Sequence, residues 1–342
     1  MDPSWFQSYL TDRHQTVRMN NVLSLPHPIS YGVSQGSILG PILFLIYIND
    51  MSDYLKNCLL VQYADDTQIL LTGDIDNVNE LLNQAEIILA EAKLYFQNNG
   101  LKVNESKTQC IFFGSRHNIA RIPNEIEVRF SNSSIKPSTR VKNLGIIMDQ
   151  YLLYDSHISE ITKKITGTLL YINRISDRFE VNTRIMLVQS LAISILNYCL
   201  RVWGMTNKTQ IERSQKLQNF AAKVAIGGAR KFDHVSPIIE KLQWLRMSKK
   251  IFMEVCVMVF KHKRRLIPEW LFNFESRGQV RDVRTRQEED LVVNRFKTDI
   301  GKNSFEIIGP LNWNKLPTQI RDERSIHIFK KNLKKFLLSN DS

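Results

Sequence analysis

Residues 61–70 read VQYADDTQIL and place two adjacent carboxylates, Asp65 and Asp66, between two short apolar segments. Residues 59–63 and 67–71 are rich in β-branched and aromatic side chains, which predicts a β-hairpin with the acids at or near its turn. An ionised carboxylate beside buried strands is costly to desolvate, and a second one beside it repels the first. A divalent cation would offset both costs, whereas an exposed Asp-Asp turn is the commoner explanation of the pair taken alone.

Composition predicts a globular protein. The chain has 342 residues, 43% of them hydrophobic and 23% charged, enough for a sizeable core and two or three structural units. Its 4 cysteines form no C-x-x-C pair, so neither a disulfide framework nor a zinc module is indicated. The longest apolar run, 38–48, falls short of the ~20 residues that a membrane helix needs. With no signal peptide, we expect an intracellular protein of the nucleus or cytoplasm that is not secreted and does not enter a membrane.

Charge is distributed unevenly along the chain. Residues 1–150 carry 12 Lys+Arg against 15 Asp+Glu, whereas residues 151–342 carry 34 against 19, so the whole net charge of +12 comes from the second part. A carboxylate pair in one part and a strongly basic second part are typical of a metal site beside a polyanion-binding surface. Solvated basic helices would give the same balance.

Periodicity predicts an α+β fold class. Helices are expected over 4–10, from 37–41 onward, and over 81–96, the last closed by Asn98-Asn99-Gly100. Strands are expected at 110–113, 126–130 and 141–148. From about residue 155 the pattern is helical. The expected inward-facing residues of these later helices are Ile158, Ile161, Ile165, Leu169 and Ile172, and then Ile211, Leu217, Phe220 and Val224.

Four sequence blocks follow one another in the first 150 residues. They read GVSQGSILGP at 32–41, YADD at 63–66, GLKVNESKT at 100–108 and VKNLGI at 141–146. In this order they resemble the reverse transcriptases of non-LTR retrotransposons. An intron-encoded maturase would also fit YADD, but LGPILF at 39–44 favours the retrotransposon type.

The resemblance implies an architecture. Residues 1–150 would form a partial polymerase palm, an antiparallel sheet with packed helices. Residues 151–230 would form a helical, thumb-like region, and residues 231–342 a basic, mostly helical C-terminal region. The implied activity is RNA-directed DNA polymerisation by two-metal nucleotidyl transfer, with an RNA template, a DNA primer and deoxynucleoside triphosphates as partners. The oligomeric state stays open.

The resemblance also assigns roles around the acids. Asp65 would be the principal ligand of Mg²⁺, or of Mn²⁺ in its place, and Asp66 a weaker or neighbouring ligand. Tyr63 and Ala64 would shape the floor under the primer end.

Three residues outside the hairpin receive roles by the same resemblance. Gln35 and Gly36 would lie near the incoming nucleotide and the template base. Lys107 would approach the triphosphate and could protonate pyrophosphate, although a surface lysine before a strand explains it as well. Ser34 stands where the family usually has Pro, which bears on loop rigidity more than on chemistry.

The helices of the thumb-like region offer phosphate contacts whose binding should weaken steeply with salt. The expected contact residues are Lys163, Lys164, Arg174, Arg213, Lys216 and Lys223. Further on, residues 313–317 and 329–336 resemble a terminal segment of retroelement proteins, and they also fit a packed terminal helix. The basic run 261–265 is expected to be a solvated helix end.

Family members place a further Asp on a strand upstream of the helix expected at 4–10, preceded by the fingers. Asp2 and Asp12 lie too close to that helix to replace it. We therefore expect this polypeptide to polymerise poorly by itself, because a lost metal ligand costs several kcal/mol of transition-state stabilisation. The alternative is a non-catalytic nucleic-acid-binding remnant that uses the basic helices.

Overall fold

The structure is a computed structural model, and it describes residues 3–227, 233–280, 288–296 and 298–339. The contacts divide the chain into two units. The first comprises residues 1–108 and 127–135, and the second comprises residues 109–126 and 136–342. Each is described by itself.

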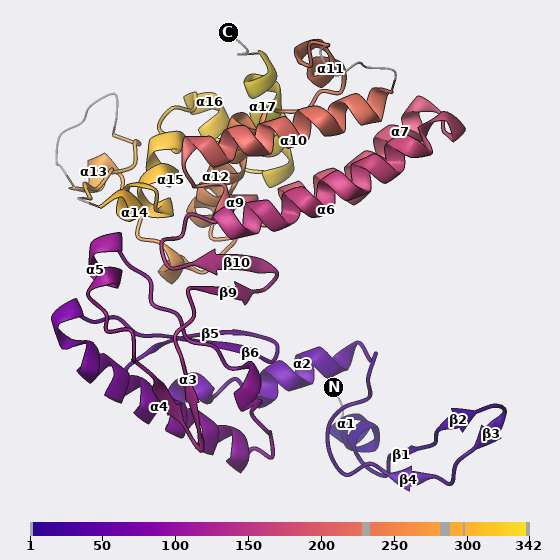
Figure 1. The fold of residues 1–342 in the computed structure, drawn as a ribbon, viewed down its shortest axis with the longest axis vertical. Helices are drawn as coiled ribbons and strands as arrows, with labels where there is room; N and C mark the ends of the chain where they lie inside the picture. Colours follow the sequence, from indigo (N-terminus) through magenta and orange to yellow (C-terminus); the bar gives the residue numbers. More distant parts are fainter. Residues whose placement is uncertain (1–2, 228–232, 281–287, 297, 340–342) are drawn as a thin grey trace. The chain divides into compact units, whose positions relative to one another are not determined.

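The first unit consists of short helices, two-stranded hairpins and one long helix (Figure 1). Its helices are α1 (Pro3–Leu10), α2 (Leu39–Tyr47), α3 (Met51–Tyr54) and α4 (Val78–Asn98). Its strands are β1 (His14–Gln15), β2 (Arg18–Met19), β3 (Val22–Leu23), β4 (His27–Pro28), β5 (Leu59–Tyr63), β6 (Asp66–Leu70), β7 (Val128–Phe130) and β8 (Ser133–Ile135).

The second unit is mostly helical. One antiparallel pair, β9 (Arg140–Asn143) and β10 (Ile146–Asp149), precedes its main helices. The helices are α5 (Arg116–Ala120), α6 (Asp155–Arg174), α7 (Val181–Val188), α8 (Ser194–Asn197), α9 (Leu200–Trp203), α10 (Lys208–Ile226), α11 (Ser236–Lys241), α12 (Met247–Lys263), α13 (Arg277–Val280), α14 (Asp299–Lys302), α15 (Phe305–Trp313), α16 (Thr318–Arg321) and α17 (Ile326–Ser339).

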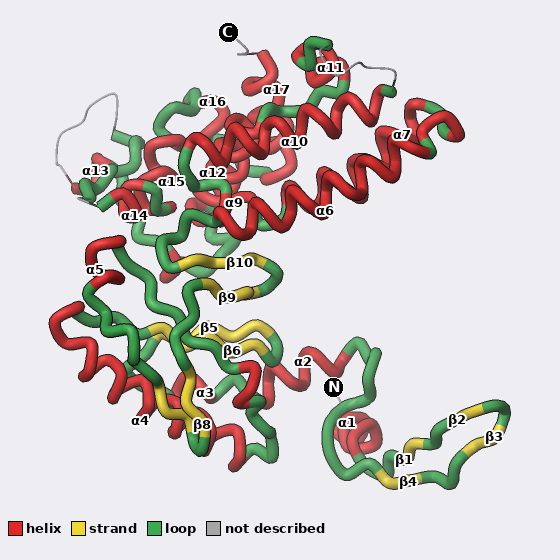
Figure 2. Tube along the Cα trace, viewed as in Figure 1, coloured by secondary structure: helices red, strands yellow, loops and turns green. Residues whose placement is uncertain are grey.

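Strands in the described part of the chain pair only two by two (Figure 2). The pairs are β1–β4, β2–β3, β5–β6, β7–β8 and β9–β10, all antiparallel. Helices with small antiparallel sheets confirm the α+β class.

Helical periodicity located the long helices correctly. In α6 the five residues expected to face inward are all buried, none more than 7% exposed. In α10, Leu217 and Val224 are buried, and Ile211 and Phe220 pack partly buried against the same core. The α4 helix ends as its stop signal predicts: Gly100 has φ +64° and the Leu101 amide bonds the Phe96 carbonyl at 2.7 Å.

The strand expected at 110–113 is wrong. This segment has no ladder partner in the described structure. Single backbone bonds hold it instead, from the Ser138 amide to the Cys110 carbonyl at 2.7 Å and from the Gly114 amide to the Gln150 carbonyl at 3.1 Å. An apolar run predicts burial, but strand formation also needs a neighbouring strand.

Three clusters of buried side chains form the interior. The small core of the first unit contains Met51, Leu55, Ile88, Ala92 and Tyr95. In the second unit, the α6 core joins α6, α10 and neighbouring helices, and the α12 core joins α12, α15 and α17. Helix α12 contributes to both cores, with Met247 and Val255 in one and Cys256 and Phe260 in the other.

Candidate active site

The acids lie on the predicted hairpin. Strands β5 and β6 pair from Leu59 opposite Leu70 to Tyr63 opposite Asp66, so Ala64 and Asp65 form a two-residue turn. Asp66 is thus the first residue of β6 rather than part of the turn.

The turn is strained. Ala64 has φ +52°, whereas Asp65 is not among the positive-φ residues. A positive φ at the first central residue alone is the pattern of a type II′ turn, where glycine is preferred. An L-residue there costs about 1–2 kcal/mol. Strain of this kind concentrates at functional sites, and here it sets the direction in which Asp65 leaves the hairpin.

The hairpin has an inner and an outer face. Leu60 and Ile69, which are paired, pack against the small core, and the Gln62 amide contacts the Met51 sulfur at 3.2 Å. Directly opposite residues share a face, so Tyr63 and Asp66 lie together on the outer one. The Tyr63 side chain is 64% exposed. No residue of β5 or β6 is fully buried, so the two apolar runs are less covered than strands of an interior sheet.

Both acids are exposed, and neither side chain has a hydrogen bond or ion pair to any described residue. Free carboxylate oxygens fit a hard divalent cation, which commonly takes one or two protein carboxylates and completes its shell with phosphates and water. Within the described ranges, no group of three or more His, Cys, Asp or Glu could hold a metal. The hairpin therefore presents two exposed carboxylates whose oxygens have no partner among the described side chains.

A third acid of the first unit, Asp50, accepts a hydrogen bond from a side chain of the protein. The Tyr95 hydroxyl donates a hydrogen bond to the Asp50 carboxylate, and the two side chains link α4 to the start of α3. Burial, followed by this bond and the Asp50 charge, raises the pKa of Tyr95. Asp50 therefore acts as a structural acceptor.

The loop that precedes α2 contains Gln35 and Gly36. Gly32 and Gly36 have φ +79° and +81°, and a Cβ at either would meet nothing within 4 Å, so the glycines serve the backbone conformation. The loop is anchored at its ends, where the Tyr9 hydroxyl bonds Ser37 Oγ at 2.7 Å and the Arg13 guanidinium bonds the Gly32 carbonyl at 2.6 Å. Gln35 itself is exposed.

Lys107 ends a short 3₁₀ helix, Glu105–Lys107, and is exposed. Its neighbour Glu105 anchors the segment through an ion pair with Lys93 at 2.9 Å and a bond from Ser133. The Lys93 hydrogen bond is the main cause that lowers the pKa of Glu105. No hydrogen bond or ion pair of the described structure joins Gln35, Gly36 or Lys107 to the hairpin, so these residues are not held together by polar contacts.

The six basic residues expected to contact phosphates lie on two packed helices, α6 and α10 (Figure 1). Lys163, Lys164, Arg174, Arg213 and Lys216 are exposed and Lys223 is partly exposed. The Arg213 guanidinium donates to Ser159 Oγ at 3.0 Å across the pair.

Sequence reasoning missed two features. The Asp50–Tyr95 bond joins residues 45 positions apart, and no local pattern announced it. The lysines of α17, spaced K-K-x-x-K-K at 330–335, were interpreted only as part of a terminal segment or packed terminal helix, and not as a charged face. No helix in the described part of the chain combines the length and apolar character needed to cross a bilayer.

Comparison with known proteins identifies the first part of the chain. Residues 1–148 match the family described as reverse transcriptase (RNA-dependent DNA polymerase). No solved structure matches significantly.

Three fruit-fly proteins illustrate the relatives. The chain is 28% identical to a probable RNA-directed DNA polymerase from transposon BS of Drosophila melanogaster, over 64% of this chain and 24% of the relative. It is 24% identical to a probable RNA-directed DNA polymerase from transposon X-element of the same species, over 65% of this chain and 24% of the relative. It is 23% identical to the RNA-directed DNA polymerase from mobile element jockey, also of this species, over 62% of this chain and 24% of the relative.

The chain spans about a quarter of the length of these relatives, 24% in each case. The matched family and the named relatives confirm the resemblance of this chain to the reverse transcriptases of non-LTR retrotransposons.

Proposed function

We propose that this chain supplies the palm and thumb of an RNA-directed DNA polymerase, which extends a DNA primer on an RNA template with deoxynucleoside triphosphates. The observation that supports this most directly is the β5–β6 hairpin. Its strained turn presents Asp65, with Asp66 beside it, exposed and unpaired within the described structure. Such a reaction places the protein inside the cell, in the nucleus or cytoplasm.

The hairpin residues have separate tasks in this proposal. Asp65 is the principal ligand of a divalent cation, Mg²⁺ or Mn²⁺, and Asp66 the weaker one. When bound, the cations would favour deprotonation of the primer 3′-hydroxyl and offset the charge of the departing pyrophosphate. Tyr63 and Ala64 form the floor under the primer end, since Tyr63 shares the outer face with Asp66.

Residues of the neighbouring loops handle the nucleotide. Gln35 and Gly36 lie at the nucleotide and the template base, where the missing Cβ of Gly36 leaves room for close backbone approach. Lys107 reaches the triphosphate and holds the proton for the pyrophosphate oxygen. The Glu105–Lys93 ion pair anchors the segment that carries Lys107.

In the same proposal, residues 1–150 act as the palm, residues 151–230 as the thumb and residues 231–342 as a basic accessory region. The α6–α10 pair would then follow the phosphates of the template–primer duplex. These contacts position the duplex without reading its sequence.

Primer extension on an RNA template, with Mg²⁺ and then Mn²⁺, tests the catalytic assignment. Asp65→Asn should lower extension by a factor on the order of 10³, since charge-stabilising groups at active sites carry roughly that weight. Asp66→Asn should have a smaller effect. Asp53→Asn is the matched control, because Asp53 is an exposed acid on α3 outside the hairpin. Equal rates for Asp65→Asn and Asp53→Asn would refute the assignment.

A second measurement is independent of activity. Fe²⁺ bound at the carboxylates, supplied with hydrogen peroxide and with ascorbate to reduce the Fe³⁺ formed, generates hydroxyl radicals, which should cleave the backbone near residues 63–66 in the wild type and in Asp53→Asn but not in Asp65→Asn.

The alternative function is a nucleic-acid-binding protein without catalysis. It is favoured by one observation, the absence from the described residues of any cluster of three metal-binding side chains. No extension and no local cleavage by the wild type, with salt-dependent binding of nucleic acid retained, would support it.

A further inference from the structure

Helix α17 carries a strongly basic face. Lys330, Lys331, Lys334 and Lys335 are all exposed, and they form two i,i+4 pairs about 6 Å apart along the helix axis. Like charges at this spacing repel one another and weaken the helix. None of the four has an ion pair or hydrogen bond with another described side chain.

The opposite, apolar face of α17 packs inside the protein. Phe329 and Leu333 are 0% exposed, and Phe329 stacks on Phe260 with the ring centres 4.3 Å apart and lies 5.9 Å from Trp313. A basic amphipathic helix can bind membrane surfaces through its apolar face. Here that face is buried in the α12 core, so the lysines, and not the apolar face, are available to a partner.

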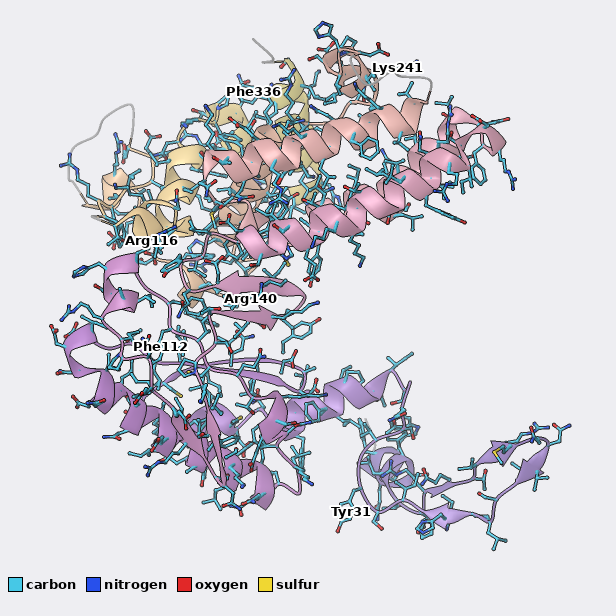
Figure 3. All side chains as sticks on the ribbon, viewed as in Figure 1. Tyr31, Phe112, Arg116, Arg140, Lys241 and Phe336 are labelled. Atoms are coloured by element: carbon cyan, nitrogen blue, oxygen red, sulfur yellow. The ribbon has the colours of Figure 1, made fainter. Side chains whose placement is uncertain are left out.

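Three of the four lysines line an open hollow beside the connection between α11 and α12. Its volume is about 490 Å³. The lining residues are Gln243, Lys331, Lys334, Lys335, Leu338 and Ser339, with no carboxylate among them. In Figure 3 the label Phe336 marks α17 and the label Lys241 marks the end of α11, two residues before Gln243.

A further lysine fixes the end of the helix. Lys249 donates from Nζ to the Leu337 carbonyl at 2.7 Å, which adds positive charge where the carbonyls of α17 end. The basic face is therefore held in a defined position by α12, both through this bond and through the aromatic stack.

The partner's chemistry follows from the lining. Three ammonium groups, an amide and a hydroxyl offer donors, and no aromatic side chain is present on which a base could stack. Lysine, amide and hydroxyl donors commonly contact phosphate oxygens. The location also differs from that of the six thumb residues, because α17 packs on α12 and α16, whereas α6 and α10 pack on each other and on α7.

We propose that the α17 hollow is a second nucleic-acid site, which binds the phosphodiester backbone without regard to sequence. It neutralises phosphates through Lys331, Lys334 and Lys335. The site requires neither a divalent cation nor the β5–β6 hairpin, so it goes beyond the proposed polymerase function and does not depend on it.

The test is equilibrium binding of fluorescent single-stranded RNA and of duplex DNA to the full chain, in a chelator and without nucleotides, over a range of salt. The salt slope is the steepness with which the logarithm of the binding constant falls with the logarithm of the salt concentration. Each neutralised phosphate adds about 0.7 to this slope for a single strand and about 0.9 for a duplex. Lys331→Gln, Lys334→Gln and Lys335→Gln together should therefore lower the slope by about 2 for RNA and by nearly 3 for duplex DNA.

The matched control removes three exposed lysines elsewhere, through Lys56→Gln, Lys208→Gln and Lys302→Gln. Far-UV circular dichroism and thermal unfolding should show that both triple variants fold like the wild type, since all six side chains are exposed. An unchanged slope in the α17 variant, or an equal decrease in both triple variants, would overturn the proposal.

Two further arms separate this site from its competitors. Lys163→Gln, Lys164→Gln and Arg174→Gln together should impair primer extension if the thumb proposal holds. When the α17 substitutions are added to this variant, they should still lower the salt slope by the same amount. Vesicles containing anionic phospholipid should bind the chain equally before and after the α17 substitutions. Loss of vesicle binding with unchanged RNA binding would assign the hollow to a membrane surface instead.

Discussion

The two units of this chain differ in how much of their structure they bury. The first unit has five fully buried side chains in its small core, and apolar residues such as Ile38 (89% exposed) and Ile46 (67% exposed) face outward. The second unit buries two extensive cores, and within it α12 is covered on both sides. The candidate chemistry lies in the loosely packed unit and the basic helices lie in the well-packed one.

This difference has a physical explanation. Helices α6, α10, α12 and α17 each present a wide apolar stripe to a neighbouring helix, so the second unit satisfies its own hydrophobic pattern. The hairpins of the first unit are two-stranded, and an isolated pair of strands is marginal in water. The β5–β6 hairpin packs on α3 and α4, and β7 packs on α4, whereas the strands β1 to β4 are exposed throughout.

The largest expected effect is in the α12 core. Phe329→Ala should lower the free energy of unfolding of the second unit by about 3–5 kcal/mol, because it removes a fully buried ring from a stack with Phe260 and Trp313. Urea denaturation followed by near-UV circular dichroism would measure it. Ile328→Ala is the control on the same helix, since Ile328 is 49% exposed, and it should change stability by no more than about 0.5 kcal/mol.

Comparable losses in the two variants would mean that α17 is not packed as described. Both the buried stack and the orientation of the lysines would then be in question.

The sequence predicted elements whose pattern is local and repeated. The buried stripe of α6 and the stop signal after α4 were both correct, because each depends on residues a few positions apart. The β5–β6 hairpin was also located, since its two apolar runs flank the acids directly. Ala64 could be assigned to the turn, but its positive φ could not be foreseen, because alanine carries no signal for that backbone conformation.

Contacts between residues far apart in the chain could not be predicted from the sequence. Residues 261–265 were expected to form a solvated helix end, which is only partly correct. Arg264 donates to the carbonyls of Asp322 and Glu323 at 3.1 and 2.6 Å, and Lys263 lies over the Trp313 ring at 5.7 Å, where burial lowers its pKa. These partners lie some fifty or more residues away in the chain, and no periodic pattern specifies them.

The second prediction concerns the β9–β10 turn. Gly145 has φ +83°, and its Cβ would meet only Tyr198 Cε1 at an ordinary 3.5 Å, so the cost of Gly145→Ala comes from the backbone alone. We expect a loss of about 1–2 kcal/mol. Gly167→Ala is the control: this α6 glycine has nothing within 4 Å, and alanine should stabilise the helix by up to about 1 kcal/mol. Thermal unfolding should therefore show shifts of opposite sign, and shifts of the same sign would contradict the turn geometry.

The third prediction concerns a positive-φ residue of the first unit, where introducing glycine should raise stability instead of lowering it. Ala64→Gly relieves about 1–2 kcal/mol of left-handed strain and loses about 0.5–1 kcal/mol to the more flexible unfolded chain. A net gain of about 0.5 kcal/mol is expected, seen as slower amide exchange in β5 and β6. Ala85→Gly, inside α4, should instead destabilise the unit by about 1 kcal/mol. Faster exchange in both variants would show that the turn is not strained.

The smallest effect is a pH dependence confined to the second unit. His157, on α6, is 4% exposed and lies 5.9 Å from Trp203. Burial is the main cause that lowers its pKa below 6.5; Lys142 also lowers it, and Glu160 acts in the opposite direction. The unfolded chain therefore takes up this proton at a higher pH than the folded one, so the contribution is present above pH 6.5 and is lost as pH falls through the lowered value.

Urea midpoints measured between about pH 7.5 and about pH 5.5 should fall on acidification in the wild type and fall less in His157→Gln. The control is His117→Gln, because His117 is exposed on α5, and it should keep the dependence of the wild type. If His157→Gln kept the full dependence, the pH sensitivity would have to arise from the carboxylates. Glu105 would then be the first to consider, since its lowered pKa also gives stability that is lost toward acid, but in the first unit.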